Sequence, residues 1–185
     1  MVESGNMLIA MAGLPGSGKS TVAGEVARAL GCALFSVDPI EAAMWRAGIG
    51  QDQPTGLAAY VVAEDLAREQ LLIGHDAIVD AVNDVEAARD QWVALAARLS
   101  HPLAFVEVFC SDAEEHQRRL RDRRREIVGF PESTWASVIE RRESICAWAD
   151  DRLRVDSMRP LNENVMAVLE YAERVRHAAI LPEQS

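Results

Sequence analysis

Nine consecutive residues near the start of the chain have the composition of a phosphate-binding loop. Gly13–Thr21 reads GLPGSGKST and fits the pattern G-x-x-x-x-G-K-[ST]. Glycines let the backbone turn successive N–H groups inward around an anion, and a helix that begins directly after the loop adds the positive end of its dipole. In such a loop the lysine reaches the β- and γ-phosphates, and the hydroxyl that follows it is a ligand for Mg²⁺. The segment therefore predicts a site for ATP with Mg²⁺.

The expected contacts to the nucleotide come from eight residues of this loop, which are Gly13, Pro15, Gly16, Ser17, Gly18, Lys19, Ser20 and Thr21. Lys19 is the only lysine among the 19 basic residues of the chain. A compact ammonium and a guanidinium fork are not interchangeable at a crowded phosphate site, so this exception favours a role in phosphate binding.

Two aspartates follow apolar runs that precede helical patterns. Asp80 lies within Ala77–Val82, where an unpaired buried carboxylate would be costly, so we expect it to hold Mg²⁺ or its water shell together with Ser20. Asp38 follows the run Ala33–Val37 and has two interpretations. It is either the general base that accepts a proton from an attacking hydroxyl, or an N-cap with Pro39 at the first helical position.

Polar residues after Asp80 leave further alternatives open. We expect Asn83 or Asp84 to cap the helix that begins near Val85, and Asn83 could also contact substrate. Arg89 would lie on that helix, either as a solvated charge or as a substrate contact.

Six arginines lie within the eight residues 118–125. The pairs Glu114–Arg118 and Glu115–Arg119 have i,i+4 spacing and explain two of them as a solvated helix face. The others have few acidic neighbours, and clustered guanidiniums are suited to stabilising a transferring phosphoryl group. We therefore expect a helical lid over about residues 118–148 whose arginines close over ATP. A nucleic-acid patch is the alternative, but it lacks the interleaved aromatic residues that stack on single strands.

Short apolar runs that alternate with helical patterns must position these residues, and they predict a doubly wound α/β domain. The expected strands are Met7–Ala12, Ala33–Val37, Ala77–Val82, Leu103–Phe109 and Leu153–Val155. The expected helices are Lys19–Leu30, Pro39–Ala47, Leu57–Ile73, Val85–Leu99, Asp112–Arg125, Glu132–Ala149 and Leu161–His177. Gly31 and Gly74 are expected at helix ends, and Ser111–Glu114 has the pattern of a capping box. Ligands of such a domain bind beyond the carboxyl ends of the strands, where Asp38 and Asp80 would face the loop.

Composition restricts the class of protein. A length of 185 residues suits one domain, which we expect to span 1–185 with the lid as an insertion. The net charge of −10 argues against a protein that mainly grips nucleic acid. No apolar run has the length of a membrane span and the start lacks a signal-peptide pattern, so we expect a cytoplasmic protein without membrane contact. The three cysteines are widely spaced, and buried reduced thiols are expected.

The combination of these segments resembles the zeta-toxin and polynucleotide-kinase-like branch of small P-loop kinases, whose members are also described as AAA domain proteins. The resemblance covers about Leu8–Ala172. The segments that carry it are GLPGSGKST (13–21), Val37-Asp38, AIVDAVNDVEAAR (77–89), RLRDR (119–123) and RVDSMRPL (154–161).

This resemblance implies a three-layer P-loop kinase fold with a five-stranded parallel sheet, and transfer of the γ-phosphate of ATP to a hydroxyl. It implies that Asp38 is the base, that Arg123 is the lid arginine at the phosphates, and that Asp156–Arg159 lies near the adenine. Arg119 and Arg159 are also expected among the nucleotide contacts.

The acceptor is expected to be a small molecule rather than a nucleic acid. Relatives that act on phosphate-bearing acceptors tend to have Arg three residues after the base, where this chain has Glu41, with Arg46 as a possible substitute. Glu41 favours a neutral or cationic acceptor. A nucleotide-binding switch with a protein partner and a nucleic-acid 5′-hydroxyl kinase are the alternatives. The helical stretch Gln51–Gln70, with Tyr60, Glu64 and Asp65, is expected to line the acceptor pocket together with Trp45, and the alternative for each is a place in the core or on the surface.

Overall fold

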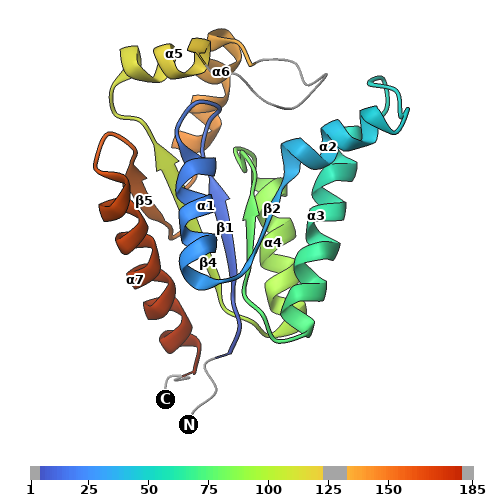
Figure 1. The fold of residues 1–185 in the computed structure, drawn as a ribbon, viewed down its shortest axis with the longest axis vertical. Helices are drawn as coiled ribbons and strands as arrows, with labels where there is room; N and C mark the ends of the chain where they lie inside the picture. Colours follow the sequence, from blue (N-terminus) through green and yellow to red (C-terminus); the bar gives the residue numbers. More distant parts are fainter. Residues whose placement is uncertain (1–4, 123–132, 181–185) are drawn as a thin grey trace.

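The sheet that positions the loop is all-parallel, as the sequence predicts. The computed structural model describes residues 5–122 and 133–180. Within them it contains five strands, β1 (Leu8–Ala12), β2 (Ala33–Ser36), β3 (Ala77–Asp80), β4 (Leu103–Phe109) and β5 (Leu153–Asp156). Their order in the sheet is β2-β3-β1-β4-β5, and every pairing is parallel. The carboxyl ends of the strands therefore lie at one edge, and the loops that follow them meet there (Figure 1).

The helices fall close to the predicted ranges. They are α1 (Lys19–Leu30), α2 (Val37–Arg46), α3 (Thr55–Leu72), α4 (Glu86–Leu99), α5 (Ala113–Asp122), α6 (Trp135–Cys146) and α7 (Leu161–Ile180). The largest difference is at α6, which is shorter at both ends than expected. The expected extension of α5 to Arg125 lies outside the described residues.

The two faces of the sheet are covered by different pairs of helices. Alternate residues of β1, which is fully buried, point to opposite faces of the sheet. Leu8 and its alternates pack with α3 and α4, whereas Ile9 and its alternates pack with α1 and α7. On α3 the buried positions recur every four residues, at Ala59, Ala63, Ala67 and Leu71. This spacing produces one narrow apolar stripe of small residues that lets the helix lie close to the sheet.

A third, smaller cluster fixes α5 and α6 above the carboxyl edge of the sheet. Leu120 of α5 and two residues of α6, Val138 and Ile145, pack with Leu14 of the phosphate loop. Figure 1 shows both helices at the top of the molecule, on the side where the loop emerges. Among the described helices none combines the length and apolarity needed to cross a membrane.

Three of the predicted caps are wrong. Helix α2 begins at Val37 with Ser36 at the N-cap position, so Asp38 lies in the first turn of the helix and does not cap it. Helix α4 has Val85 at its N-cap and no side-chain cap, because Asn83 is fully buried and bonded elsewhere. At α5 the capping oxygen comes from Asp112, which accepts from the N–H groups of residues 114 and 115 at 2.9 and 3.0 Å, rather than from Ser111.

Gly31 does end α1 in the left-handed conformation, as predicted, with its N–H bonded to the carbonyl of Ala27. Gly74 follows the end of α3 and has a φ of +90°, which also agrees with the predicted helix end.

Candidate active site

The phosphate loop connects β1 to α1 and depends on glycines with positive φ. Gly13, Gly16 and Gly18 have φ of +148°, +82° and +93°. A Cβ at Gly13 would collide with the carbonyl oxygen of Val108, so only glycine fits the backbone there. The N–H of Gly13 is bonded to the carbonyl of Val82 at 3.1 Å, which ties the loop to the segment after β3.

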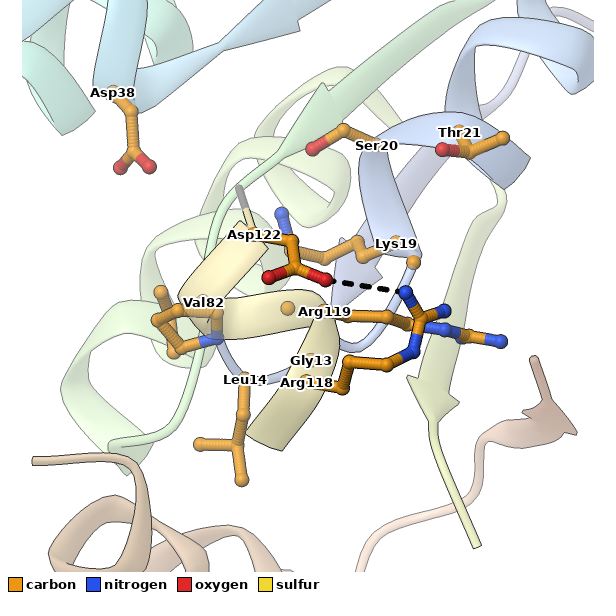
Figure 2. Close-up of a pocket in the computed structure, with 13 residues that line it drawn as sticks. Gly13, Leu14, Lys19, Ser20, Thr21, Asp38, Val82, Arg118, Arg119 and Asp122 are labelled. Atoms are coloured by element: carbon orange, nitrogen blue, oxygen red, sulfur yellow. Dashed lines mark hydrogen bonds and ion pairs between the residues drawn. The ribbon is translucent and has the colours of Figure 1, made fainter. Parts of the chain in front are cut away.

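A cavity of about 370 Å³ lies over this loop, and we call it the phosphate-loop cavity. Its lining residues are Gly13, Leu14, Pro15, Gly16, Gly18, Lys19, Ser20, Thr21, Asp38, Val82, Arg118, Arg119 and Asp122. Figure 2 shows Asp38 reaching in from α2 on one side, while Ser20 and Thr21 lie on α1 on the other. The fold thus brings most of the predicted nucleotide contacts and the predicted base to one cavity.

Three predicted nucleotide contacts are not among the residues that line this cavity. The Ser17 side chain is buried, and its hydroxyl, which has no hydrogen-bond partner among the described residues, lines a smaller cavity behind the loop. Arg159 is exposed and forms an ion pair with Glu163 at 2.8 Å. Arg123 lies outside the described residues.

Lys19 and Asp80 form the ion pair at the centre of the site. The ammonium of Lys19 donates to the carboxylate of Asp80, whose other oxygen accepts a 3.2 Å hydrogen bond from the hydroxyl of Ser36. Asp80 is 5% exposed and lies level with Ser36 in the sheet. The carboxylate of Asp80 therefore has a partner, whereas the sequence suggested that it would be unpaired. The ion pair with Lys19 accounts for a buried acid in an apolar strand.

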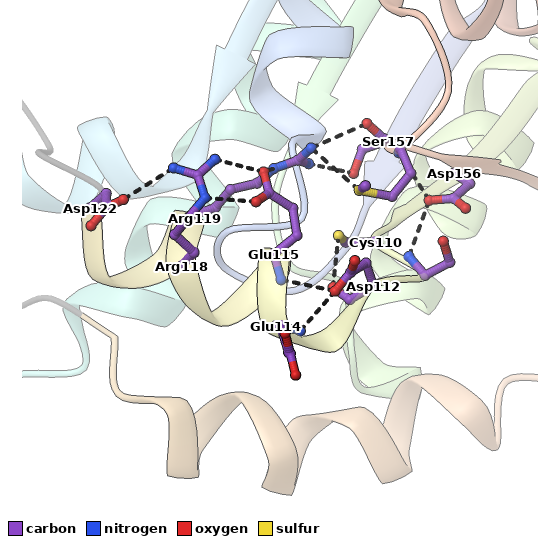
Figure 3. Close-up of polar contacts among 11 residues, drawn as sticks. Cys110, Asp112, Glu114, Glu115, Arg118, Arg119, Asp122, Asp156 and Ser157 are labelled. Atoms are coloured by element: carbon purple, nitrogen blue, oxygen red, sulfur yellow. Dashed lines mark hydrogen bonds and ion pairs between the residues drawn. The ribbon is translucent and has the colours of Figure 1, made fainter.

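Arg118 and Arg119 enter the phosphate-loop cavity from α5 and share one acidic partner (Figure 3). Both guanidiniums are bonded to Glu115 at 2.7 Å, and Arg118 also bonds to Asp122 at 3.2 Å. The hydrogen bonds from Arg118, followed by those from Arg119, lower the pKa of Glu115 to about 2. The predicted pair Glu115–Arg119 is confirmed, whereas Arg118 pairs with Glu115 and Asp122 instead of Glu114.

Arg119 also joins α5 to the loop between β5 and α7. Its guanidinium donates to the hydroxyl of Ser157 at 2.8 Å. Ser157 lies against Gly18, where an added Cβ would come within 3.1 Å of the serine Cβ. The segment that the resemblance places near the adenine therefore borders the phosphate loop.

His116 and Asn83 bond to backbone carbonyls of the phosphate loop and of β1, and sequence reasoning missed both roles. His116 is buried and its Nε2 lies 2.8 Å from the carbonyl of Pro15, and burial lowers its pKa, so the neutral ring donates this bond. The Asn83 amide donates to the carbonyl of Met11 at 2.8 Å and accepts from the indole of Trp92 at 2.9 Å. These contacts cross 101, 72 and 9 residues of sequence, so local patterns could not indicate them.

Arg89 has neither of the two predicted roles. It is 7% exposed, and its guanidinium donates to the carbonyls of Asn83 and Asp84 at 3.2 and 3.1 Å. It also stacks on the ring of Trp148 at 4.6 Å from the centroid. Arg89 therefore fixes the segment after β3 in place and does not reach solvent as a free charge.

A second cavity, of about 580 Å³, adjoins the first, and we call it the lateral cavity. Pro15, Asp38 and Val82 line both cavities. The remaining lining residues are Val37, Glu41, Trp45, Gly56, Tyr60, Asp84, Val85, Ala88, Ser133, Thr134, Ser137 and Arg141.

Two of the predicted acceptor-pocket residues, Trp45 and Tyr60, line the lateral cavity, but Glu64 and Asp65 do not. Glu64 is paired with Arg98 of α4, and Asp65 is exposed. Arg46, the possible substitute for an arginine after the base, is exposed and lines neither cavity. Sequence reasoning did not identify Asp84 or Arg141 as lining residues. Arg141 lies on α6, which is distant in sequence from the other lining elements.

Comparison with known proteins places the chain in a family. Residues 8–145 match the family described as AAA domain. Since this match covers more than half of the chain, the protein belongs to that AAA domain family. None of the curated proteins compared with the chain matches it.

Solved structures of kinases share the fold at low sequence identity. A sugar kinase from Janibacter sp. HTCC2649 is 18% identical, with a TM-score of 0.66 over 94% of this chain and 98% of its own. A gluconokinase from Sinorhizobium meliloti 1021 is 19% identical, with a TM-score of 0.67 over 96% of each chain. An APS kinase from Mycobacterium tuberculosis, in complex with AMPPNP and APS, is 19% identical, with a TM-score of 0.62 over 91% of this chain and 98% of its own.

Proposed function

We propose that the protein is a phosphotransferase that moves the γ-phosphate of ATP to a hydroxyl of a small molecule. The observation that carries this proposal is the position of Asp38, which lines both the phosphate-loop cavity and the lateral cavity. A base at this boundary can take a proton from an acceptor on one side while that acceptor attacks a phosphate on the other.

In the proposed reaction each residue has a defined task. The loop N–H groups and Lys19 hold the phosphates, and the arginines of α5 stabilise the charge on the transferring group. The acceptor oxygen bonds to the γ-phosphorus as the bond to the β–γ bridging oxygen breaks. ADP leaves, and the hydroxyl proton passes to Asp38. Arg119 is the described candidate for the lid arginine, and contacts from Arg123 and Arg159 remain predictions.

The residues at the loop fit Mg²⁺ in part. Ser20 lies in the first turn of α1 and lines the phosphate-loop cavity. Asp80 supplies a carboxylate on β3, the strand next to β1. Mg²⁺ is bound in such sites through one or two protein oxygens together with substrate phosphates. Among the described residues no group of three His, Cys, Asp or Glu side chains forms a metal site. Bound Mg²⁺ would neutralise phosphate charge.

Two kinds of comparison support the proposal. Structural neighbours include a sugar kinase, a gluconokinase and an APS kinase that was solved with AMPPNP. Membership of the AAA domain family agrees with nucleotide binding. We further propose, on the basis of the sequence segments described above, that the protein is a member of the zeta-toxin and polynucleotide-kinase-like branch. A cytoplasmic location is a separate proposal.

Substitution of the base tests the proposal directly. Asp38→Asn should reduce phosphate transfer at least 100-fold while the affinity for ATP changes less than about threefold, because general-base catalysis contributes about 10²–10⁴-fold. Transfer of labelled phosphate to a panel of polyols and sugars measures the first quantity, and calorimetric titration with ATP measures the second.

Asp65→Asn is a matched control, because this aspartate is exposed on α3 and lines neither cavity. Transfer by Asp38→Asn at the wild-type rate would contradict the assignment of the base. ATP consumption that does not depend on any acceptor would contradict the proposed function.

A further inference from the structure

The lateral cavity has the size and position of a site for a small acceptor. Its volume of about 580 Å³ lies within the 300–1,000 Å³ range of small-molecule sites. Its lining residues come from the phosphate loop, α2, α3, the segment after β3, α4, and α6 with the two residues before it. Its wall continues into the phosphate-loop cavity through Pro15, Asp38 and Val82, so a molecule seated here borders the site of the transferred phosphate.

The described lining of this cavity carries more carboxylates than basic side chains. Among the described residues that line it, three bear carboxylates, namely Asp38, Glu41 and Asp84, and one bears a guanidinium, Arg141. Arg141 lies 3.7 Å from the carboxylate of Asp84, and the first turn of α6 adds the positive end of a helix dipole on the same side. The positive features of the described lining therefore lie beside Asp84, whereas Glu41 on α2 forms no ion pair with a described residue.

Glu41 is held in place by a chain of hydrogen bonds. The indole of Trp45 donates to the hydroxyl of Thr55 at 2.9 Å, and that hydroxyl donates to one carboxylate oxygen of Glu41 at 2.8 Å. Gly56 lies against the same carboxylate, where a Cβ would be 3.5 Å from Oε1. A carboxylate fixed by neutral partners keeps its negative charge available to a ligand.

Two aromatic side chains also contribute to the wall of this cavity. Trp45 and Tyr60 both line it. Burial is the main cause that raises the pKa of Tyr60 to about 12, so this phenol stays neutral at physiological pH. Aromatic rings next to carboxylates form a setting that attracts cations, because the ring face and the acid both favour positive charge.

We propose that the acceptor is a hydroxylated amine that binds in its protonated form. Its ammonium group is held by Glu41 beside Trp45 and Tyr60, and its reacting hydroxyl lies at Asp38. Anionic acceptors are excluded by the carboxylates of α2. This inference rests on the proposed phosphotransferase function and narrows it to one class of substrate.

Matched acceptors of different charge test the inference. Each of three scaffolds is offered as an amine, a neutral compound and an acid: glucosamine, glucose and glucuronate; 2-deoxystreptamine, inositol and quinate; serinol, glycerol and glycerate. Transfer of labelled phosphate from ATP with Mg²⁺ is followed at pH 7. We expect the amine to have the highest kcat/KM wherever a scaffold reacts, by at least tenfold over the neutral compound, and the acid to be the poorest.

The possible outcomes separate the inference from the function on which it rests. A neutral or acidic member that reacts best overturns the cationic acceptor and leaves the phosphotransferase function intact. Transfer to no member, although ATP binds, contradicts the proposed function and the inference with it.

A variant of Glu41 supplies a second measurement. Glu41→Gln keeps an oxygen for Thr55 but removes the charge, so KM for the amine should rise about tenfold while kcat and the KM for ATP change less than twofold. The preference for the amine over the neutral member should fall by the same factor. Glu69→Gln is the control, because this residue lies on α3, is exposed and lines neither cavity. An unchanged preference in Glu41→Gln would overturn the role of this carboxylate.

Discussion

The ammonium of Lys19 is bonded to the carboxylate of Asp80, on the strand beside the one that precedes the phosphate loop. Both side chains are shielded, with 12% and 4% of their surfaces exposed. The lysine that is expected to hold phosphate therefore already has an anionic partner in the protein. Bound phosphates would have to share this ammonium with Asp80 or take it over.

Removal of the ammonium should destabilise the fold as well as weaken nucleotide binding. Lys19→Met leaves a buried carboxylate without its countercharge and should lower the free energy of unfolding by about 2–4 kcal/mol. The double variant Lys19→Met, Asp80→Asn should recover most of this loss but not the affinity for ATP. Urea unfolding followed by circular dichroism measures the stability, and equal unfolding midpoints for wild type and Lys19→Met would disprove the coupling.

A pair of glycine substitutions should have opposite effects. Gly13→Ala places a methyl group against the carbonyl of Val108 at a φ of +148°, so we expect a loss of about 3 kcal/mol or more and no ATP binding. Gly24→Ala, in α1 with nothing within 4 Å of the new Cβ, should stabilise the protein by about 0.5–1 kcal/mol. Thermal unfolding measures both changes. A stable Gly13→Ala protein that binds ATP would contradict the described loop geometry.

Asn83 should be needed for stability although it lies beside a cavity. Asn83→Ala leaves the indole N–H of Trp92 buried without a partner and removes the shorter of two hydrogen bonds to the carbonyl of Met11, which should cost about 2–3 kcal/mol. Asn162→Ala, at an exposed position of α7, should change stability by less than about 0.5 kcal/mol. Chemical denaturation of both variants checks the difference. Equal stabilities would mean that the Asn83 network contributes nothing.

The cysteines should differ in reactivity. The sequence led us to expect buried thiols, but Cys146 is exposed and Cys32 only partly buried. Burial, assisted by the charge of Asp76, raises the pKa of Cys32 from 9.0 to about 11. At pH 8 only about one Cys32 thiol in a thousand is ionised, so iodoacetamide should modify Cys146 first, as measured by peptide mass spectrometry.

The same shift predicts a dependence of stability on pH. The folded pKa of Cys32 lies above the unfolded value, so its contribution to stability is complete below about pH 9 and is lost as the pH rises towards 11. Cys32→Ala should remove this part of the alkaline destabilisation. For the reactivity prediction of the preceding paragraph, equal rates of modification of Cys32 and Cys146 by iodoacetamide at pH 8 would contradict the different environments of the two thiols.

The fold and the phosphate loop could be predicted because both are encoded by local patterns. Continuous apolar runs such as that of β1 indicate buried parallel strands, and the glycines before Lys19 indicate a loop that turns N–H groups towards an anion. Both signals lie within a few consecutive residues. The sheet and the lining of the phosphate-loop cavity accordingly follow the sequence closely.

The partners of single polar residues could not be predicted, because they come from distant parts of the chain. The partner of Asp80 lies 61 residues away, and Arg89 stacks on Trp148 of a segment that follows α6. The capping error at Asn83 has the same origin, since a buried tryptophan and a strand carbonyl compete successfully for its amide. Local propensity describes such a residue only when no tertiary partner is available.

Because Asp38 belongs to the walls of both cavities, its carboxylate offers a route by which the two proposed binding events can be coupled. A ligand that changes the charge or position of this carboxylate from one side alters the free energy of binding on the other. Linkage requires the effect to be equal in both directions, so the acceptor must change the affinity for nucleotide by the same factor by which nucleotide changes the affinity for the acceptor.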